Sequence, residues 1–300
     1  MTSTTDTPMT DAPAAAVAAW RARQGPGIDE PGVYDIPFDA YLRHPALSKS
    51  KMFNLLETCP AQFLYDLEHP QPPKKEYDFG TAAHKLLLGV GAEIAVIDAD
   101  NYRDKGAARD RDFAREDGMV PLLAKDYAKA LAMVEVVRRH PIAGRLFIEG
   151  KPEQSLFWTD PESGVQMRAR LDWLGEKRDS RLMLVDFKTA KAVDLASIEK
   201  AIFDYGYHMQ RAQYVNGAIA LGLGDDDTDL AFVFQSKTPP YLVRVVQLEM
   251  NAIRLGRARI RKAIAIYLEC LESGHWYGYD ETSYAALPAY GERRDEEEYL

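Results

Sequence analysis

Cysteine is scarce in this sequence. The 300 residues include two, Cys59 and Cys270, and no CxxC pair. Two cysteines cannot build a zinc ribbon or a four-cysteine iron–sulfur cluster within one chain, which excludes both kinds of site. Such low cysteine usage is typical of proteins in a reducing compartment, so we expect a cytoplasmic protein.

Long apolar runs and helicase motifs are missing as well. No stretch approaches the roughly 20 apolar residues that a membrane helix needs, so we expect no membrane association. The first residues lack a charged segment followed by an apolar one, which argues against a secretory signal. No GxxxxGK(S/T) motif is present, which excludes a helicase fused to this chain.

The net charge of −9 is unevenly distributed. Residues 1–35 and 292–300 each hold five acids against two arginines, a net −3 apiece, and −3 remains for residues 36–291. A body so close to neutral neither supports nor excludes a nucleic-acid partner. The first segment is rich in Thr, Ala, Pro and Gly. We therefore expect a flexible leader at 1–35, one folded domain at 36–291 and an acidic tail at 292–300.

Hydrophobic periodicity predicts helices before and after a group of strands. A helix capped by Ser48 or Ser50 breaks near Pro60, Thr81 caps a second helix, and Pro121 opens a third. Later elements are strands at 151–160, 165–177 and 181–190, a helix at 197–222, strands at 230–236 and 241–249, and a helix at 251–274. The first three strands read as a meander. The order predicts one α/β domain with a mixed central sheet flanked by helices.

The segment "RLDWLGEKRDSRLMLVDFKTAK" carries charges where a buried strand is expected. Side chains two positions apart project from the same face of a strand, so Asp186 and Lys188 stand side by side. Asp172 lies fourteen residues earlier, in the preceding strand. Charges in so apolar a segment are costly unless they are paired or ligate a metal. A surface Asp–Lys pair is the plain alternative.

These residues match the needs of phosphodiester hydrolysis. Mg²⁺ prefers carboxylates, waters and phosphate oxygens as ligands. The reaction also needs a group that orients the attacking water. Two acids on adjacent strands, with a lysine two residues beyond one of them, can supply both functions.

Four further residues are candidates for the same site, each with a simpler alternative. Glu153, on the strand before Asp172, adds a carboxylate or is a surface acid. His84, in "GTAAH", ligates a divalent metal or is structural. Gln210 and Tyr214 share one helix face and contact a phosphate or nucleotide, or only pack.

Taken together, the motifs resemble the PD-(D/E)xK nuclease superfamily, and within it the RecE type, exodeoxyribonuclease VIII of phage and prophage recombination. The resemblance spans about residues 46–290, through "LSKSKMFNLLETCPAQFLYDL", "FGTAAH", "RARLD", "VDFKTA" and "YHMQRAQY", in family order. It implies a restriction-endonuclease-like core, with residues 36–291 as the nuclease domain. The absence of a cysteine cluster disfavours the iron–sulfur branch of the superfamily.

The resemblance also implies roles for the site residues. Asp172, Asp186 and the Phe187 carbonyl would ligate Mg²⁺, with Mn²⁺ as a possible substitute, and His84 would complete the metal shell. Lys188 would orient the water. Glu153, Gln210 and Tyr214 would support the site.

By the same resemblance, the function would be a Mg²⁺-dependent exonuclease that resects double-stranded DNA ends 5′ to 3′ for single-strand-annealing recombination. Its partners would be DNA ends, an annealing protein of the RecT type, and further copies of itself in a homo-oligomer. Two alternatives stay open, an endonuclease and a non-catalytic DNA-binding protein with the same fold.

Overall fold

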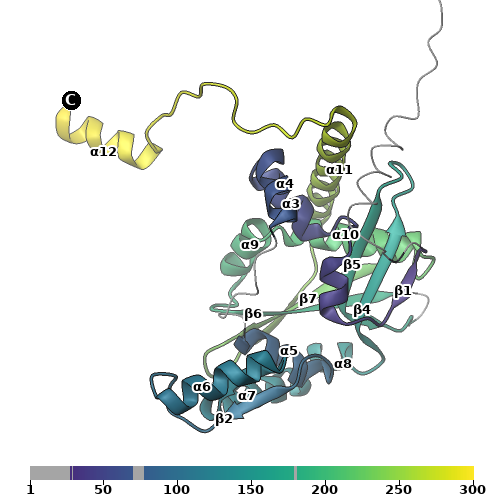
Figure 1. Cartoon of the computed structure of the whole chain (residues 1–300), viewed down its shortest axis with the longest axis vertical. Coiled ribbons are helices and arrows are strands. Elements are labelled where there is room, and N and C mark those ends of the chain that lie inside the picture. The colour runs from purple at the N-terminus through teal and green to yellow at the C-terminus, as the bar shows by residue number, and fades with distance from the viewer. Residues whose placement is uncertain (1–27, 29, 70–77, 179–180) are drawn as a thin grey trace, which may run out of the picture.

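The computed structural model describes residues 28, 30–69, 78–178 and 181–300 (Figure 1). The strands are β1 (Gly32–Tyr34), β2 (Ile94–Ile97), β3 (Val120–Leu123), β4 (Gly150–Thr159), β5 (Gln166–Gly175), β6 (Met183–Ala190), β7 (Asp229–Ser236) and β8 (Val243–Val246). The helices are α2 (Phe38–Arg43), α3 (Lys49–Glu57), α4 (Pro60–Glu68), α5 (Asp78–Leu88), α6 (Lys105–Glu116), α7 (Ala124–Arg139), α8 (Ala143–Leu146), α9 (Leu195–Asp204), α10 (Tyr207–Ala220), α11 (Met250–Ser273) and α12 (Ala289–Tyr299). Most of the predicted leader, residues 1–27 and 29, lies outside the described residues.

The main sheet has six strands in the order β1-β4-β5-β6-β7-β8. Strands β6 and β7 are parallel, and the other neighbours are antiparallel. A small parallel pair, β2 with β3, lies beside α6 and α7. The mixed sheet flanked by helices confirms the predicted fold class. The β4-β5-β6 meander was predicted correctly from short strand-like runs separated by turn residues.

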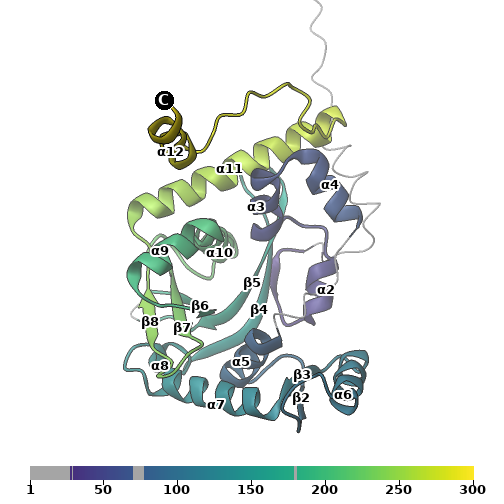
Figure 2. The same cartoon turned by 90° about the vertical axis from the view of Figure 1, so that its left-hand side faces the viewer.

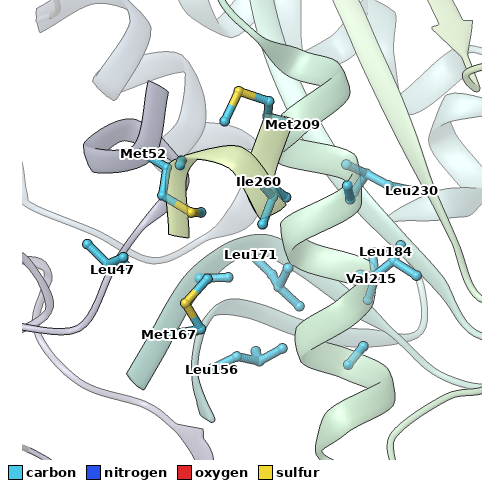
Figure 3. Packing of buried hydrophobic residues seen from close by; sticks show 14 of the residues in the cluster. Leu47, Met52, Leu156, Met167, Leu171, Leu184, Met209, Val215, Leu230 and Ile260 are labelled. Carbon is cyan, nitrogen blue, oxygen red and sulfur yellow. The ribbon is translucent and has the colours of Figure 1, made fainter. Parts of the chain in front are cut away.

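Helices cover both faces of the main sheet, and each face has its own hydrophobic core (Figure 2). The larger core lies against α3, α10 and α11. Figure 3 shows Leu156, Leu171 and Leu184 of the sheet beside Met209 and Val215 of α10. The second core joins the other face to α5 and α7. Among the helices that the structure describes, none is long and apolar enough to cross a bilayer.

Local signals placed several boundaries correctly. Ser48 caps α3, accepting a hydrogen bond from the amide of Lys51 at 3.3 Å. Helix α4 begins at Pro60, as the predicted break requires. The predicted tail lies in α12, which stands apart from the rest of the chain in Figures 1 and 2 and buries none of its side chains.

Three predicted boundaries were wrong. Pro121 lies in strand β3, paired with Ala95, and the following helix begins only at Ala124. Thr81 lies inside α5 instead of capping it. The predicted helix 197–222 is two helices, because Gly206 between them has the left-handed φ of +62°. A Cβ at Gly206 would also lie 2.4 Å from the ring of Phe53, so glycine is needed there for packing too.

Helix α10 is buried between the sheet and α11, polar side chains included. Arg211 pairs with Asp229 at 2.9 Å, and Gln213 donates to two backbone carbonyls. Helix α11 approaches closely enough that a Cβ on Gly256 would lie 2.2 Å from the carbonyl oxygen of His208. The axial position of α10 is therefore fixed by backbone contact.

We expect Gly256→Ala to lower stability, because the added methyl group meets backbone that cannot rotate away. Overpacking of this kind typically costs about 1–3 kcal/mol. Gly291→Ala in α12 is the matched control, since its Cβ would have no contact closer than 3.9 Å. Thermal unfolding followed by circular dichroism measures both. Equal melting temperatures for the two variants would contradict the packing constraint on α10.

Candidate active site

Three acidic residues lie in one row across the meander. Glu153 on β4 is opposite Asp172 on β5, because the residues on either side of them are paired in one register. The flanking pairs are Pro152 with Trp173 and Gln154 with Leu171. Asp186 on β6 follows the pair formed by Trp173 and Val185, so it lies opposite Asp172 from the other side. Successive antiparallel strands thus bring together residues that are far apart in sequence.

The sheet opens at this row. Strands β5 and β6 share two paired positions, Trp173 with Val185 and Leu174 with Leu184, although both strands are long. Beyond them, the amide of Phe187 donates to Asp172 Oδ2 at 2.7 Å. A side chain therefore takes the place of a backbone partner, and the two strands diverge where the carboxylates meet.

The backbone of Glu153 is strained. Its φ is +52°, in the left-handed region that non-glycine residues seldom adopt. Such a conformation costs on the order of 1–3 kcal/mol and persists where the surroundings enforce it. Arg170 contacts this residue: its Nε lies 2.6 Å from Glu153 Oε2, and its Nη1 donates to Ser155 Oγ at 2.8 Å. Strained residues of this kind gather at functional sites.

Strand β5 also changes face at Asp172. Leu171 packs in the larger core, while Trp173, two residues on, packs in the second core on the opposite face. In a regular strand these two side chains would share a face. Because the strand changes face here, the Asp172 carboxylate packs in neither core and lies at the opening between β5 and β6.

His84, Glu153 and Asp172 could hold a metal ion together. One donor atom from each lies within 4.8 Å of the others, and all three side chains are partly exposed. Helix α5 fixes His84 by burying its neighbours Ala82 and Ala83. The separation of 3.6 Å between His84 Nδ1 and Asp172 Oδ2 is too long for a hydrogen bond. These two atoms are therefore not bonded to each other. Carboxylate and imidazole donors suit a divalent cation.

Asp186 is held differently from the other two acids. Its side chain is 2% exposed, and Lys188 Nζ lies 2.6 Å from Oδ2. Gln210 of α10 donates to the other carboxylate oxygen, Oδ1. The Lys188 ammonium also lies 4.9 Å from the centre of the Tyr207 ring. An ammonium and an amide thus fix the orientation of this carboxylate.

Burial and the closely spaced acids shift several pKa values in the site. Burial, followed by the charge of Asp186, raises the pKa of Asp172 to about 7. Burial lowers the pKa of Lys188, but the charges of Asp186 and Asp172 outweigh it and the net shift is upward. Burial raises the pKa of Tyr214 well above its usual value, and the charge of Asp186 adds to the rise. The site therefore has an excess of negative charge that a bound cation would relieve.

The structure gathers the predicted residues into two adjoining groups. His84, Glu153 and Asp172 form one, and Asp186, Lys188 and Gln210 form the other. Tyr214 lies one helical turn beyond Gln210, where the charge of Asp186 reaches it. Phe187 takes part through its amide, while its side chain packs in the second core.

Sequence reasoning missed two residues of this region. Arg170 is one of them. It belongs to the motif "RARLD", and its position two residues before Asp172 could have suggested a role in the site. Lys49 lies beside the second group, where burial and then the charge of Lys188 lower its pKa to about 8. No local pattern in the sequence could have found Lys49, because the contact joins segments about 140 residues apart.

Comparison with known families and structures gives a consistent result. The model of a family described as "PDDEXK-like domain of unknown function (DUF3799)" matches residues 48–285, which include every predicted site residue. The fold is similar to that of a candidate exonuclease from Eubacterium rectale, with a TM-score of 0.55 and 10% identity over 85% of this chain and 97% of that one. A second structure, SSO0001, has 14% identity over 64% of this chain and 88% of that one, with a TM-score of 0.24, too low to indicate a shared fold. No curated protein matches.

We expect the contribution of Asp172 to the stability of the metal-free protein to decrease as the pH rises from about 4 to 7. The pKa of Asp172 in the folded state, about 7, lies above the value of about 3.9 in unfolded chains. The folded state therefore holds this proton more tightly. Its stabilising effect is complete below pH 4 and is lost as the pH passes 7.

Asp172→Asn removes this titration and keeps an acceptor for the Phe187 amide. Its unfolding free energy relative to the unmodified protein should rise between pH 4.5 and pH 7.5, by up to about 4 kcal/mol at 1.36 kcal/mol per pKa unit. Urea unfolding in chelator measures the difference. Added Mg²⁺ should stabilise the unmodified protein at pH 7.5, since a cation favours the ionised carboxylate. A difference that does not change with pH would contradict the assignment.

Proposed function

Because the chain belongs to the DUF3799 family of PDDEXK-like domains, we propose that it is a nuclease that hydrolyses phosphodiester bonds with the help of a divalent metal. The observation that carries this proposal is the row of three carboxylates at the opening of the sheet, with a lysine fixed beside it. The likeness to the candidate exonuclease supports the same reaction class. The alternative of a non-catalytic relative is less favoured, because the acids and the lysine are all present and close together.

The donor set fits Mg²⁺ best, with Mn²⁺ as a substitute. Asp172 and Glu153 offer hard oxygen donors, and His84 offers one nitrogen. The family resemblance adds Asp186 and the Phe187 carbonyl to this set. A bound divalent cation would polarise the scissile phosphate and lower the pKa of a water molecule for attack.

The remaining residues hold the carboxylates in position and supply a positive charge to the site. Lys188 holds its proton at Nζ, and from there it can donate to the attacking water or to a phosphate oxygen. Gln210 fixes the carboxylate of Asp186, and the amide of Phe187 fixes that of Asp172. Arg170 keeps Glu153 turned toward Asp172. These contacts hold the reacting groups in place before substrate arrives, which is the main contribution that a protein makes in phosphate chemistry.

Within the superfamily we propose the RecE type of activity. The enzyme would digest the strand with the 5′ end at a double-stranded DNA end and leave a 3′-ended single strand. An annealing protein of the RecT type would then bind that strand. We further propose that residues 36–291 form the nuclease domain, and that several copies assemble into a homo-oligomer around the duplex. Enclosure would explain processive digestion by a domain whose net charge is close to neutral.

Lys188→Met should reduce cleavage at least about a hundredfold, the usual loss when one positioned donor to the reacting groups is removed. Lys191→Met is the matched control, since Lys191 is exposed and lies three residues further on. Cleavage of a fluorescent duplex in Mg²⁺ measures both, with melting temperatures to verify folding. Chelator should abolish activity, and Mg²⁺ or Mn²⁺ should restore it. Full activity of a folded Lys188→Met variant, or of the wild type in chelator, would refute the mechanism.

Polarity and end dependence can be tested on one DNA. A linear duplex labelled at the 5′ or the 3′ end is incubated beside a covalently closed circle of the same sequence. We expect immediate release of the 5′ label, slow loss of the 3′ label and an intact circle. Rapid nicking of the circle would establish the endonuclease alternative and rule out the resection role.

A further inference from the structure

A lysine without an acidic partner lies beside the active site. Lys49 begins helix α3, and its ammonium donates to the backbone carbonyl of Tyr205. It lies 4.8 Å from the centre of the Phe53 ring and 5.8 Å from that of Tyr207. Lys49 is half-buried, and within the described part of the chain no carboxylate forms an ion pair with it.

The position of Lys49 relative to the catalytic lysine is well defined. Both ammonium groups lie against the same Tyr207 ring, with Lys188 Nζ 4.9 Å from its centre. Lys188 is paired with Asp186, whereas Lys49 is a positive charge beside it without an ion pair among the residues that the structure describes. Close packing of Gly206 against Phe53 holds α3 and the α9–α10 turn together. The charge is therefore placed by rigid elements.

The same turn exposes two aromatic side chains. Tyr205 is 60% exposed and Phe203 is 70% exposed, at the end of α9. The Tyr205 ring lies 5.7 Å from the Tyr207 ring, and the backbone carbonyl of Tyr205 accepts from the Lys49 ammonium. Exposed rings beside a fixed cation are the combination by which proteins bind single-stranded nucleic acid, the ring stacking on a base and the cation contacting the backbone.

We propose that Lys49 and Tyr205 bind the nucleotide next to the scissile phosphate, with Lys49 on its backbone phosphate and Tyr205 stacked on its base. A base can stack on Tyr205 only when it is unpaired, so the strand is single-stranded where it enters the site. This inference rests on the proposed nuclease function and specifies the form of its substrate. The competing explanation is structural, since Lys49 could serve only to satisfy the last carbonyl of α9.

The test is binding of a fluorescein-labelled single-stranded oligonucleotide, followed by anisotropy in EDTA and again in Ca²⁺, where no cleavage is expected. Lys49→Met should weaken binding and reduce the slope of log affinity against log salt by about 0.7, the value for one phosphate contact on a single strand. Lys105→Met is the matched control, because Lys105 is likewise the first residue of a side-chain-capped helix, α6. Lys49→Arg should retain the slope.

The aromatic contact has its own pair of variants. Tyr205→Ala should weaken binding about tenfold, as expected for one lost stacking contact, and Tyr205→Phe should bind normally. Phe113→Ala, which removes a 55% exposed ring on α6, is the control and should have no effect. In cleavage assays the Lys49 and Tyr205 variants should raise KM more than they lower kcat.

Three outcomes would overturn the inference. One is equal affinity and salt slope for Lys49→Met and Lys105→Met. Another is a lower melting temperature for Lys49→Met with unchanged binding by the folded fraction, which would establish the structural role. The third is no oligonucleotide binding by the wild type under either condition. If the wild type cleaves DNA while these variants bind normally, only this inference fails. Binding that depends on Lys49, without any cleavage in Mg²⁺, would support the inference and refute the proposed function.

Discussion

Asp172 and Asp186 lie opposite one another on two diverging strands. The rest of the site depends on this close placement of two acids. Two carboxylates held opposite one another in a largely buried place repel, and burial raises the cost further. Each is therefore compensated separately. Asp186 receives an ammonium and an amide, while Asp172 receives a backbone N–H and faces His84. Burial, followed by the charge of Asp186, still raises the pKa of Asp172, and a bound cation would favour the ionised form of this carboxylate.

The strands and helices that carry these compensating groups are held rigid by strand pairing and helix packing, and not by the site itself. Strand β6 is paired with β7 along its whole length, so Asp186 and Lys188 cannot move independently of the sheet. Helix α10 is packed between the sheet and α11, which fixes Gln210. Glu153, whose backbone is strained, pairs with Arg170 within the hairpin. Stability in the surroundings thus maintains an arrangement of like charges that would not persist by itself.

The sequence allowed the fold class and the meander to be predicted, because these depend on local patterns. Short apolar runs between turn residues identified the strands, and the D-x-K spacing placed Asp186 and Lys188 on one face, where the structure brings them within 2.6 Å. The division of the site residues into two adjoining groups could not be predicted. It depends on where β5 and β6 stop pairing and on the change of face of β5 at Asp172. Gly206 was overlooked as a helix break because a single glycine is compatible with a helix. Only its contact with Phe53 shows why the chain must turn there.

The close contact between α11 and α10 has a consequence for biosynthesis. Residues with proposed chemical roles are all made by the time the chain reaches Tyr214, yet the helix that fixes α10 begins only at Met250. Domains generally fold as units during synthesis, so a domain is completed only after its last element has left the ribosome. A nascent chain of this protein therefore carries its acids and its lysine for some time without the support that positions Gln210. Assembly of a competent centre is thereby postponed until Gly256 has emerged and packed against His208.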